Sequence, residues 1–429
     1  MTEVDIDAIL RKAAAQADEA EVYITTSSSL ELEQRNIEVS SVFERAGTTV
    51  FLRVVKDGRI GVSATSDTTR IDAAIVAALS SAKLSEPVAG WQGLPEKTAI
   101  PAGKDPIDRT LDISVETAAE LLARMNSGAA KYPESRPVSG GVNLSKITGH
   151  LVNTHGVDLT REVSSITLAM DAICDGSTGY ASDSSPFMNR LTPEQVGEDT
   201  AFYASASRNG KMIDSGKYDV VFSEDVVDSL ILELFAEAVD GRNVLTGKSV
   251  YAGKLQQKVA ADTLSIADIP LNEQGTAWRR FDAEGTPARD TAIISKGVLS
   301  SYLYDAKTAA QAGGERTGHA HRTGTGSTVI SPHCLTITAP VEDVMEKPCL
   351  YVKEVIGAHT ANPLTGEFSV ETANAFLAEG GELVQPVKKA MLAGNVFDIL
   401  AGTLSVSEHV KPLPGALVPR MRIAGLQVI

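Results

Sequence analysis

The segment from Leu230 to Ser249, "LILELFAEAVDGRNVLTGKS", contains residue types that bind phosphate in many proteins. A phosphate-binding loop has the form G-x-x-x-x-G-K-[ST], follows a strand and opens a helix. Here five residues separate Gly241 from Gly247, which is one too many for that form. The residues before Gly241 have the apolar spacing of a helix, so the order of the elements is also reversed. Both observations argue against a phosphate site.

Positions 236–241 of the same segment could instead belong to a metal site. A zinc helix of the H-E-x-x-H type places two histidines on one face. The longer H-E-x-x-x-H form separates them by about 140°, so it needs a widened turn or a helix end. These positions read Ala-Glu-Ala-Val-Asp-Gly, so Ala236 and Gly241 stand at the two ligand places and cannot bind a metal. Only Glu237, at the general-base place, remains as a candidate catalytic residue, and a base without a metal loses most of the hydrolytic mechanism.

A second cluster of reactive side chains lies in "GHAHRTGTGSTVISPHC", which ends at Cys334. Imidazole and thiolate groups are good zinc ligands, but we expect no carboxylate to orient the histidines. We therefore interpret it as a surface or substrate-facing loop rather than a metal site. The flanking arginines could bind a peptide carboxylate with two hydrogen bonds, or could be solvated loop charges. The candidate substrate-binding residues are Arg316, His319, His321 and Arg322, with His333 and Cys334 beside them.

The carboxylates of Glu237 and Asp240 could face the same way on a helix. A magnesium or calcium site made of carboxylates would need several more oxygens placed by the fold. Asp240 is more simply a helix-end residue, with Gly241 as the left-handed residue that follows the helix. The other histidines are scattered, and no G-x-S-x-G elbow is present, so the sequence assigns no further nucleophile.

The element that must position residues 236–241 is a helix over about 224–239. Ser223 can cap its N-terminus, and two acidic residues follow in the first turn. Apolar side chains cover more than one face, which is typical of a central buried helix. A purely structural role for this helix is the alternative to any catalytic one.

The rest of the chain predicts an α+β fold. A mixed helix and strand region occupies 1–210, with a Pro- and Gly-rich sub-boundary near 93–110. A strand-rich domain with one central buried helix occupies 211–429. Asp57-Gly58 lies between alternating apolar residues and predicts a tight hairpin turn.

Composition limits the partners and the compartment. The net charge of −16 and a pI of about 5.0 argue against nucleic-acid binding. Three cysteines without C-x-x-C spacing favour a reducing compartment. The N-terminal residues lack the pattern of a signal peptide, and no apolar run is long enough to span a membrane. We therefore expect a cytoplasmic protein that contacts neither nucleic acid nor membrane.

Several stretches resemble the TldD/PmbA (TldE) family of metalloproteases over nearly the whole chain. "GTTVFLRVVKDGRIGVSATSD" is similar to the family's first region, and "LVNTHGVDLTREVSSITLAM" is similar to its second. "FDAEGTPARDTAIISKGVLSSYLYDAKTA", at 281–309, is the most specific of the matching stretches. In the TldD branch the family carries H-E-x-x-x-H and a cysteine near the C-terminus. Only Glu237 matches, and 410–425 contains no cysteine, so the chain resembles the metal-free PmbA/TldE branch.

This resemblance implies a subunit of a cytoplasmic peptidase that handles short or unfolded peptides in a closed chamber. It implies no cofactor in this chain and zinc only in a TldD-like partner, although pairing with a second copy of itself is also open. Two alternatives remain. One is an autonomous peptide hydrolase that uses another metal or nucleophile, suggested by Glu237, His319 and His321. The other is a non-catalytic peptide-binding or scaffolding homodimer.

Overall fold

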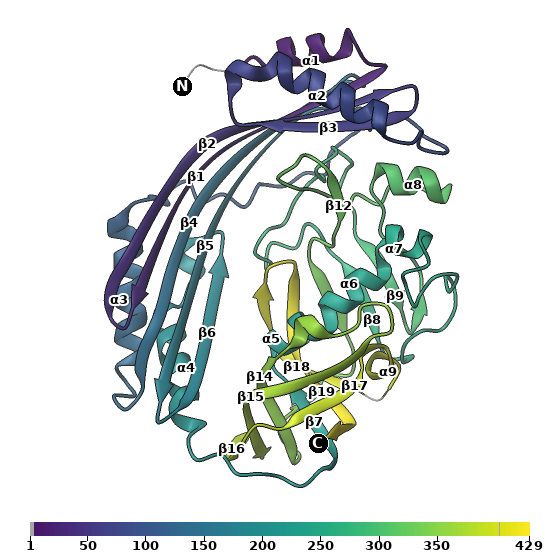
Figure 1. The fold of residues 1–429 in the computed structure, drawn as a ribbon. Coiled ribbons are helices and arrows are strands. Elements are labelled where there is room, and N and C mark those ends of the chain that lie inside the picture. The colour runs from purple at the N-terminus through teal and green to yellow at the C-terminus, as the bar shows by residue number, and fades with distance from the viewer. Residues whose placement is uncertain (1–3, 403) are drawn as a thin grey trace.

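The computed structural model describes residues 4–402 and 404–429 as an α+β protein (Figure 1). The predicted mixed N-terminal region and strand-rich C-terminal domain are both confirmed. Figure 1 shows the long N-terminal strands arching over one side of the C-terminal domain. Within the described residues, no helix combines the length and the apolar character needed to cross a bilayer.

The N-terminal region consists of two α-β-β-β-α units joined into one sheet. The sheet is antiparallel and has the order β3-β2-β1-β4-β5-β6, so the first strand of each unit meets the other at the centre. The predicted turn at Asp57-Gly58 connects β2 to β3, with both residues at positive φ. The elements are α1 (Ile6–Ala14), β1 (Glu19–Arg35), β2 (Glu38–Lys56), β3 (Arg59–Thr65), α2 (Ile71–Leu84), α3 (Val115–Ala129), β4 (Arg136–Asn153), β5 (Asp158–Cys174), β6 (Ser177–Ser185) and α4 (Pro193–Ala206).

The two faces of this sheet have different partners. Because strand side chains alternate between faces, the even-numbered residues of the central strands point to one side and the odd-numbered ones to the other. The even-numbered apolar residues pack under helices, with α1 and α2 at one end of the sheet and α3 and α4 at the other. The odd-numbered residues form the inner face, which lies toward the C-terminal domain.

The C-terminal domain is built around a closed barrel. Strand β7 pairs with both β14 and β19, and β15 and β17 complete the ring. Further strands extend the sheet from β19 through β13. The elements are β7 (Gly216–Phe222), α5 (Glu224–Val226), η3 (Val227–Leu232), α6 (Glu233–Val239), α7 (Gly241–Leu245), β8 (Ser265–Asp268), β9 (Thr291–Ser295), β10 (Val298–Leu299), α8 (Ala306–Ala312), β11 (Ala320–Arg322), β12 (Thr328–Ile330), β13 (Leu335–Thr338), β14 (Cys349–Ile356), β15 (Glu367–Glu379), β16 (Glu382–Val387), β17 (Met391–Asn395), α9 (Val396–Ala401), β18 (Leu404–Leu413) and β19 (Ala416–Val428).

The predicted central helix is confirmed as the continuous run α5, η3 and α6, whose apolar side chains lie in the largest core. Ser223 caps it as predicted, because its hydroxyl accepts a hydrogen bond from Val226 N at 3.3 Å. The middle segment, η3, is a π-helix, which has a wider turn than an α-helix. The helix ends at Asp240, which then caps α7 by accepting from Arg242 N at 2.7 Å.

The prediction that Gly241 is a left-handed residue is wrong. Gly241 is instead the first residue of α7, and its backbone N–H donates to Leu303 O at 2.9 Å. Glycine is needed there for close packing. A Cβ at this position would lie 2.2 Å from Tyr304 Cε1 and 2.7 Å from Leu303 O. The packing of a distant loop, rather than local backbone geometry, therefore requires the glycine.

The segment 93–110 carries no regular helix or strand in the structure, and it runs between the two halves of the molecule. Arg316 donates to Gly93 O, and Trp278 Nε1 donates to Lys104 O at 2.8 Å. Arg280 Nε lies 3.1 Å from Asp105 Oδ1. These contacts connect the segment to the C-terminal domain.

Candidate functional site

A cavity of about 600 Å³ lies between the inner face of the N-terminal sheet and the C-terminal domain. Strands β1, β2, β4 and β5 contribute one wall, and residues 276–283 and 321–324 contribute the other. Hydroxyl groups dominate the sheet side, and aromatic rings and arginines are distributed around the cavity. Lining residues include Tyr23, Thr25, Ser27, Phe51, Ser145, Ile147, Arg161, Ser165, Thr167, Thr276, Arg279, Phe281, Asp282, His321, Arg322 and Thr323.

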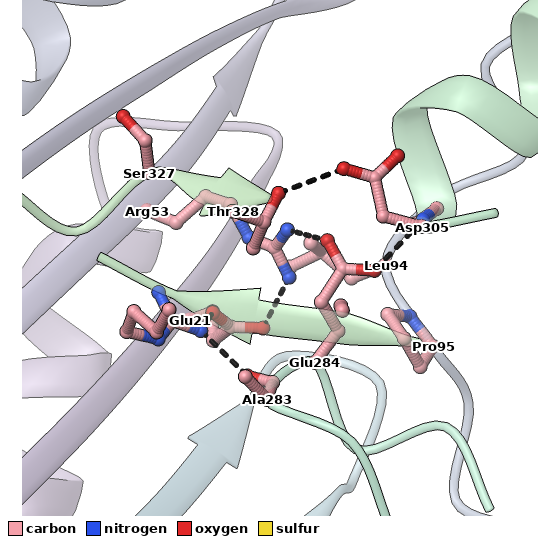
Figure 2. A network of polar contacts seen from close by, with 12 residues as sticks. Glu21, Arg53, Leu94, Pro95, Ala283, Glu284, Asp305, Ser327 and Thr328 are labelled. Atoms are coloured by element: carbon pink, nitrogen blue, oxygen red, sulfur yellow. Dashed lines mark hydrogen bonds and ion pairs between the residues drawn. The ribbon is translucent and has the colours of Figure 1, made fainter. Parts of the chain in front are cut away.

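A buried ion-pair network joins the two walls at one end of the cavity (Figure 2). Arg53, on β2, donates to Glu21 of β1 at 2.5 Å and to Glu284 of the C-terminal domain. The side chains of these residues are 4%, 1% and 0% exposed, respectively. Burial of a charge without a partner is strongly unfavourable, so the network fixes the N-terminal sheet against the C-terminal domain.

Arg322 completes this network from the opposite wall. Its guanidinium donates to Glu21 at 2.5 Å and to Ala283 O at 2.7 Å, and it lies 5.2 Å from the centre of the Tyr23 ring. With Arg53, the network then contains two arginines and two glutamates, so its charges balance. Glu284 also accepts from Ala306 N at 2.7 Å, which fixes the start of α8.

The candidate substrate residues Arg316 and Arg322 are therefore not simply solvated loop charges. The side chain of Arg322 is only 4% exposed, because it inserts between Tyr23 and the network while still lining the cavity. Arg316 lies outside the cavity lining and donates to Gly93 O. The two arginines received the same predicted role because both flank the same loop. In the structure, Arg316 contacts a backbone carbonyl of the N-terminal half and Arg322 contacts the Glu21 carboxylate.

His319 is oriented by a carboxylate that the local sequence did not reveal. Its Nε2 lies 3.0 Å from Asp268 Oδ2 and its Nδ1 lies 2.9 Å from Thr317 Oγ1. The His319 and Asp268 side chains are 1% and 0% exposed. Both ring nitrogens have partners, so His319 is a buried framework residue away from the cavity. The expectation that no carboxylate orients this histidine is wrong, because Asp268 is supplied by β8, far away in the sequence.

His321 lines the cavity and contacts His333 behind it. His333 Nε2 is 2.7 Å from Gly318 O, so it carries the proton and donates. His333 Nδ1 then accepts from His321 Nε2 at 2.9 Å. Burial and the nearby Arg279 guanidinium lower the pKa of both His321 and His333 well below the usual value, so both rings are neutral. His319 and His333 stack with 5.2 Å between ring centres, so their nitrogens do not converge on a common point.

Cys334 is close to this histidine cluster but is a poor nucleophile or metal ligand. Burial and the adjacent Asp268 carboxylate raise the pKa of the Cys334 thiol to about 12. Metal binding and nucleophilic attack both require the thiolate. Within residues 4–402 and 404–429, no group of three or more His, Cys, Asp and Glu side chains is arranged to hold a metal ion.

The candidate catalytic residue Glu237 lies on a different part of the surface from the cavity lining. Its side chain is exposed, and its Oε2 accepts from Asn243 Nδ2 at 2.7 Å, while the same nitrogen donates to Glu237 O at 2.9 Å. The structure therefore does not bring Glu237 together with His319 or His321. Tyr304 and Leu303 occupy the space that a side chain at position 241 would need. The residues at 236–241 do not fit a zinc site.

Four charged residues that matter for the cavity were not among the predicted site residues, namely Arg53, Arg161, Arg279 and Glu284. One available signal was Arg53 itself, which interrupts the apolar run "TVFLRVV". A charged residue in a buried strand is expected to pair with a buried carboxylate. Glu284 lies in the family-specific stretch "FDAEG", whose acidic residues received no role. Arg161 and Arg279 gave no local signal, because each is near a turn or loop in the sequence.

Comparisons with known proteins agree with this architecture. Three family models match, namely PmbA/TldA metallopeptidase domain 1 at residues 20–82, the central domain at 108–208 and the C-terminal domain at 215–429. An uncharacterized protein of Methanocaldococcus jannaschii is 26% identical over 406 residues, which are 94% of this chain and 95% of that protein. A metalloprotease PmbA homolog of Haemophilus influenzae is 27% identical, over 95% of this chain and 92% of that one.

The solved structures include one with the same fold along the whole chain. TldE from Thermococcus kodakarensis superimposes with a TM-score of 0.89 and 23% identity, covering 98% of this chain and 99% of that one. At this identity the likeness establishes the fold, including the arching sheet and the barrel. It does not by itself transfer a binding partner or an activity.

Proposed function

This chain belongs to the PmbA/TldA metallopeptidase family, and we propose that it is the metal-free subunit of a two-chain cytoplasmic peptidase. Its role would be to enclose a short or unfolded peptide in the cavity and present it to a zinc-bearing, TldD-like partner. The family models and the named relatives are metallopeptidases, which supports proteolysis as the class of reaction. The division of labour between two chains is our proposal.

The observation that carries the proposal is the state of residues 236–241. Ala236 and Gly241 stand at the ligand places, Glu237 is hydrogen-bonded to Asn243, and Tyr304 packs against Gly241. Hydrolysis of an amide needs an activated water and stabilisation of the developing oxyanion, which the family's metal supplies when it is bound. Neither Ala236 nor Gly241, at the two ligand places, can hold that metal, so we assign the reacting centre to a partner.

The cavity has the composition expected of a peptide-binding chamber. Hydroxyl groups of Thr25, Ser27 and Ser165 can donate to and accept from a peptide backbone without selecting a sequence. Tyr23 and Phe51, stacked with 5.9 Å between ring centres, offer an apolar surface for side chains. The volume of about 600 Å³ suits a segment of a few residues and excludes a folded protein.

The test is metal analysis and peptide hydrolysis with the purified chain, alone and after co-expression with a TldD-like chain that retains H-E-x-x-x-H. We expect the chain alone to contain no stoichiometric zinc and to cleave no unfolded peptide, while still binding it. The co-purified pair should contain about one zinc per pair and cleave the peptide. Stoichiometric zinc together with cleavage by the isolated chain would overturn the proposal in favour of an autonomous hydrolase. Peptide binding by a homodimer that never captures the second chain would favour a scaffolding role.

A further inference from the structure

Two arginines on opposite walls of the cavity form no ion pair with a carboxylate within the described residues. Arg161, on β5, donates to the carbonyl oxygens of Trp278 at 3.2 Å and Ala277 at 3.5 Å. Its Nε is buried and has no hydrogen-bond acceptor within the described residues. The Nε of Arg279 is in the same state, and no side-chain hydrogen bond or ion pair of Arg279 is found in the described part of the chain. Both residues line the cavity, so their accessible edges face its interior.

The nearby carboxylates of Asp282 and Asp268 favour the charged form of Arg279 but form no ion pair with it. Asp282 accepts from Glu284 N and Thr286 N at 2.9 Å each, and from Ala320 N at 3.1 Å. Elsewhere in the same wall, Arg280 holds Asp105 and Arg322 holds Glu21. Arg161 and Arg279 are also close enough to repel each other, and this repulsion adds to burial in lowering the pKa of Arg279 to about 9. At neutral pH both are still cationic, so the chain holds two like charges together in an enclosed space.

From this geometry we propose that Arg161 and Arg279 form a carboxylate-binding subsite that anchors the peptide in the cavity. The inference rests on the proposed peptide-binding function and specifies which chemical group of the peptide the cavity recognises. A guanidinium presents a planar set of N–H donors that matches a carboxylate, and charge-assisted hydrogen bonds are stronger than neutral ones. The cavity therefore selects a peptide by a free carboxylate, either at the C-terminus or on an acidic side chain.

Other nearby groups cannot substitute for that ligand. His321 is neutral, and its Nε2 donates to His333. It therefore adds no positive charge to the cavity and cannot act as an anionic partner for the arginines. Thr276 and Thr323 supply hydroxyls at the cavity edge, which can hold the peptide backbone beside the carboxylate. Within the described residues no carboxylate forms an ion pair with Arg161 or Arg279, so a bound anion would be their first direct ionic partner.

The experiment compares peptide binding by isothermal titration calorimetry with the full-length chain. The probes are an N-acetylated alanine pentapeptide with a free C-terminus, the same peptide as its C-terminal amide, and that amide with one central glutamate. The variants are Arg161→Gln, Arg279→Gln and the double variant. Arg289→Gln is the matched control, because Arg289 is 53% exposed and pairs with Glu315 at 3.7 Å on the surface.

We expect the free acid to bind at least about tenfold more tightly than the amide. Each single variant should lose most of this preference, the double variant should lose all of it, and Arg289→Gln should keep it. Tight binding of the glutamate-containing amide would identify any peptide carboxylate as the ligand, and weak binding would identify the C-terminal one. Equal affinity for acid and amide in the unaltered chain, or a preference that survives in the double variant, would overturn the subsite.

A second measurement separates this inference from the proposed function. Millimolar N-acetylglycine should raise the melting temperature of the unaltered chain and leave that of Arg279→Gln unchanged. If no pentapeptide binds but N-acetylglycine still acts through Arg279, the peptide-chamber function fails and the carboxylate subsite stands. If neither probe acts, both fail. Melting temperatures of the variants without ligand, compared with that of the unaltered chain, separate loss of binding from loss of folding.

Discussion

The guanidinium of Arg53 donates to the carboxylate of Glu284, which lies 231 residues further along the chain. Arg53 belongs to the N-terminal sheet and Glu284 to the C-terminal domain, so this single contact links the two walls of the cavity. Their side chains are 4% and 0% exposed. Each charge therefore depends on the other for its stability inside the protein.

The first prediction concerns this pair. Arg53→Met leaves the carboxylates of Glu21 and Glu284 buried without their common donor, and should lower the free energy of unfolding by about 3–5 kcal/mol. Guanidinium chloride denaturation measures the change. Lys12→Met is the control, because Lys12 and Asp72 form an exposed pair with side chains 57% and 79% exposed, worth less than about 1 kcal/mol. Similar small effects of both substitutions would contradict a structural role for the network.

The second prediction concerns Asp268. Its Oδ1 accepts from the backbone N–H groups of His333 at 2.8 Å and Cys334 at 2.6 Å, and its Oδ2 contacts His319. Asp268→Ala should destabilise the fold by about 2–4 kcal/mol, since buried donors lose their acceptor. Asp268→Asn should cost less, because its oxygen can retain the backbone bonds while its NH2 forces His319 Nε2 to become an acceptor.

Thermal denaturation measures the stability of both Asp268 variants, and ¹⁵N NMR of the imidazoles reports the tautomer of His319. Asp262→Ala is the control, because the Asp262 side chain is 75% exposed and pairs with the exposed Lys258. A tautomer that is unchanged in Asp268→Asn would show that Asp268 does not orient His319.

The third prediction is that histidines introduced at positions 236 and 241 do not create a zinc site. In Ala236→His/Gly241→His, the Cβ at position 241 would meet the Tyr304 ring, so we expect no stoichiometric zinc on metal analysis. Gly241→Ala alone should lower the free energy of unfolding by about 1–3 kcal/mol through overpacking. Gly47→Ala is the control, since no described atom lies within 4 Å of a Cβ there. Tight zinc binding by the double histidine variant would refute the packing argument.

The fourth prediction concerns Glu237. Because its side chain is exposed and accepts from Asn243, Glu237→Gln should retain that hydrogen bond and the fold. We expect peptide hydrolysis by the two-chain complex to change by less than about twofold, whereas loss of a general base typically lowers the rate by about 10²–10⁴-fold. Steady-state kinetics of the complex measures the effect. A loss of that size would place Glu237 in the reaction itself.

The fifth prediction is a pH dependence that arises from Asp228 in the π-helical segment. Burial, with the neighbouring Asp225 carboxylate, raises the pKa of Asp228 to about 6. An acid whose pKa is raised by folding stabilises the fold below its unfolded pKa, near 4, and this contribution is lost as the pH rises through about 6. Asp228→Asn should therefore be more stable than the unaltered chain at pH 7.5, by about 1–2 kcal/mol, and the advantage should vanish below about pH 4.

Melting temperatures of both chains between pH 4 and 8 measure this difference. A constant difference across the range would exclude titration of Asp228 as its cause. Asp225 provides the contrasting case, because burial acts against its ionisation while Lys353 and Lys411 lower its pKa overall. Asp225→Asn should accordingly destabilise the chain at neutral pH.

Elements whose determinants lie within a few residues could be predicted from the sequence. The Ser223 cap, the apolar positions of the helix that follows it and the Asp57-Gly58 turn each depend on local hydrogen bonds or on local backbone preferences. The lack of metal ligands at Ala236 and Gly241 also follows from the sequence alone, because neither residue type has a side-chain atom that binds a metal. Gly241 marks the limit of this approach, because the reason for its glycine lies in Tyr304, outside the local sequence.

The residues that line the cavity could be identified only from the tertiary structure. Alternation along β1 divides its residues into two faces, but it does not tell whether the polar face of Tyr23, Thr25 and Ser27 meets water or another domain. Likewise, Arg161 and Arg279 become neighbours only when the sheet arches over the C-terminal domain. The sequence by itself determined the start of the helix after Ser223, the turn at Asp57-Gly58, and that Ala236 and Gly241 carry no metal-binding side chain. Packing decided which charges are paired and which face the cavity, because the energy of a buried charge depends on partners that are distant in the chain.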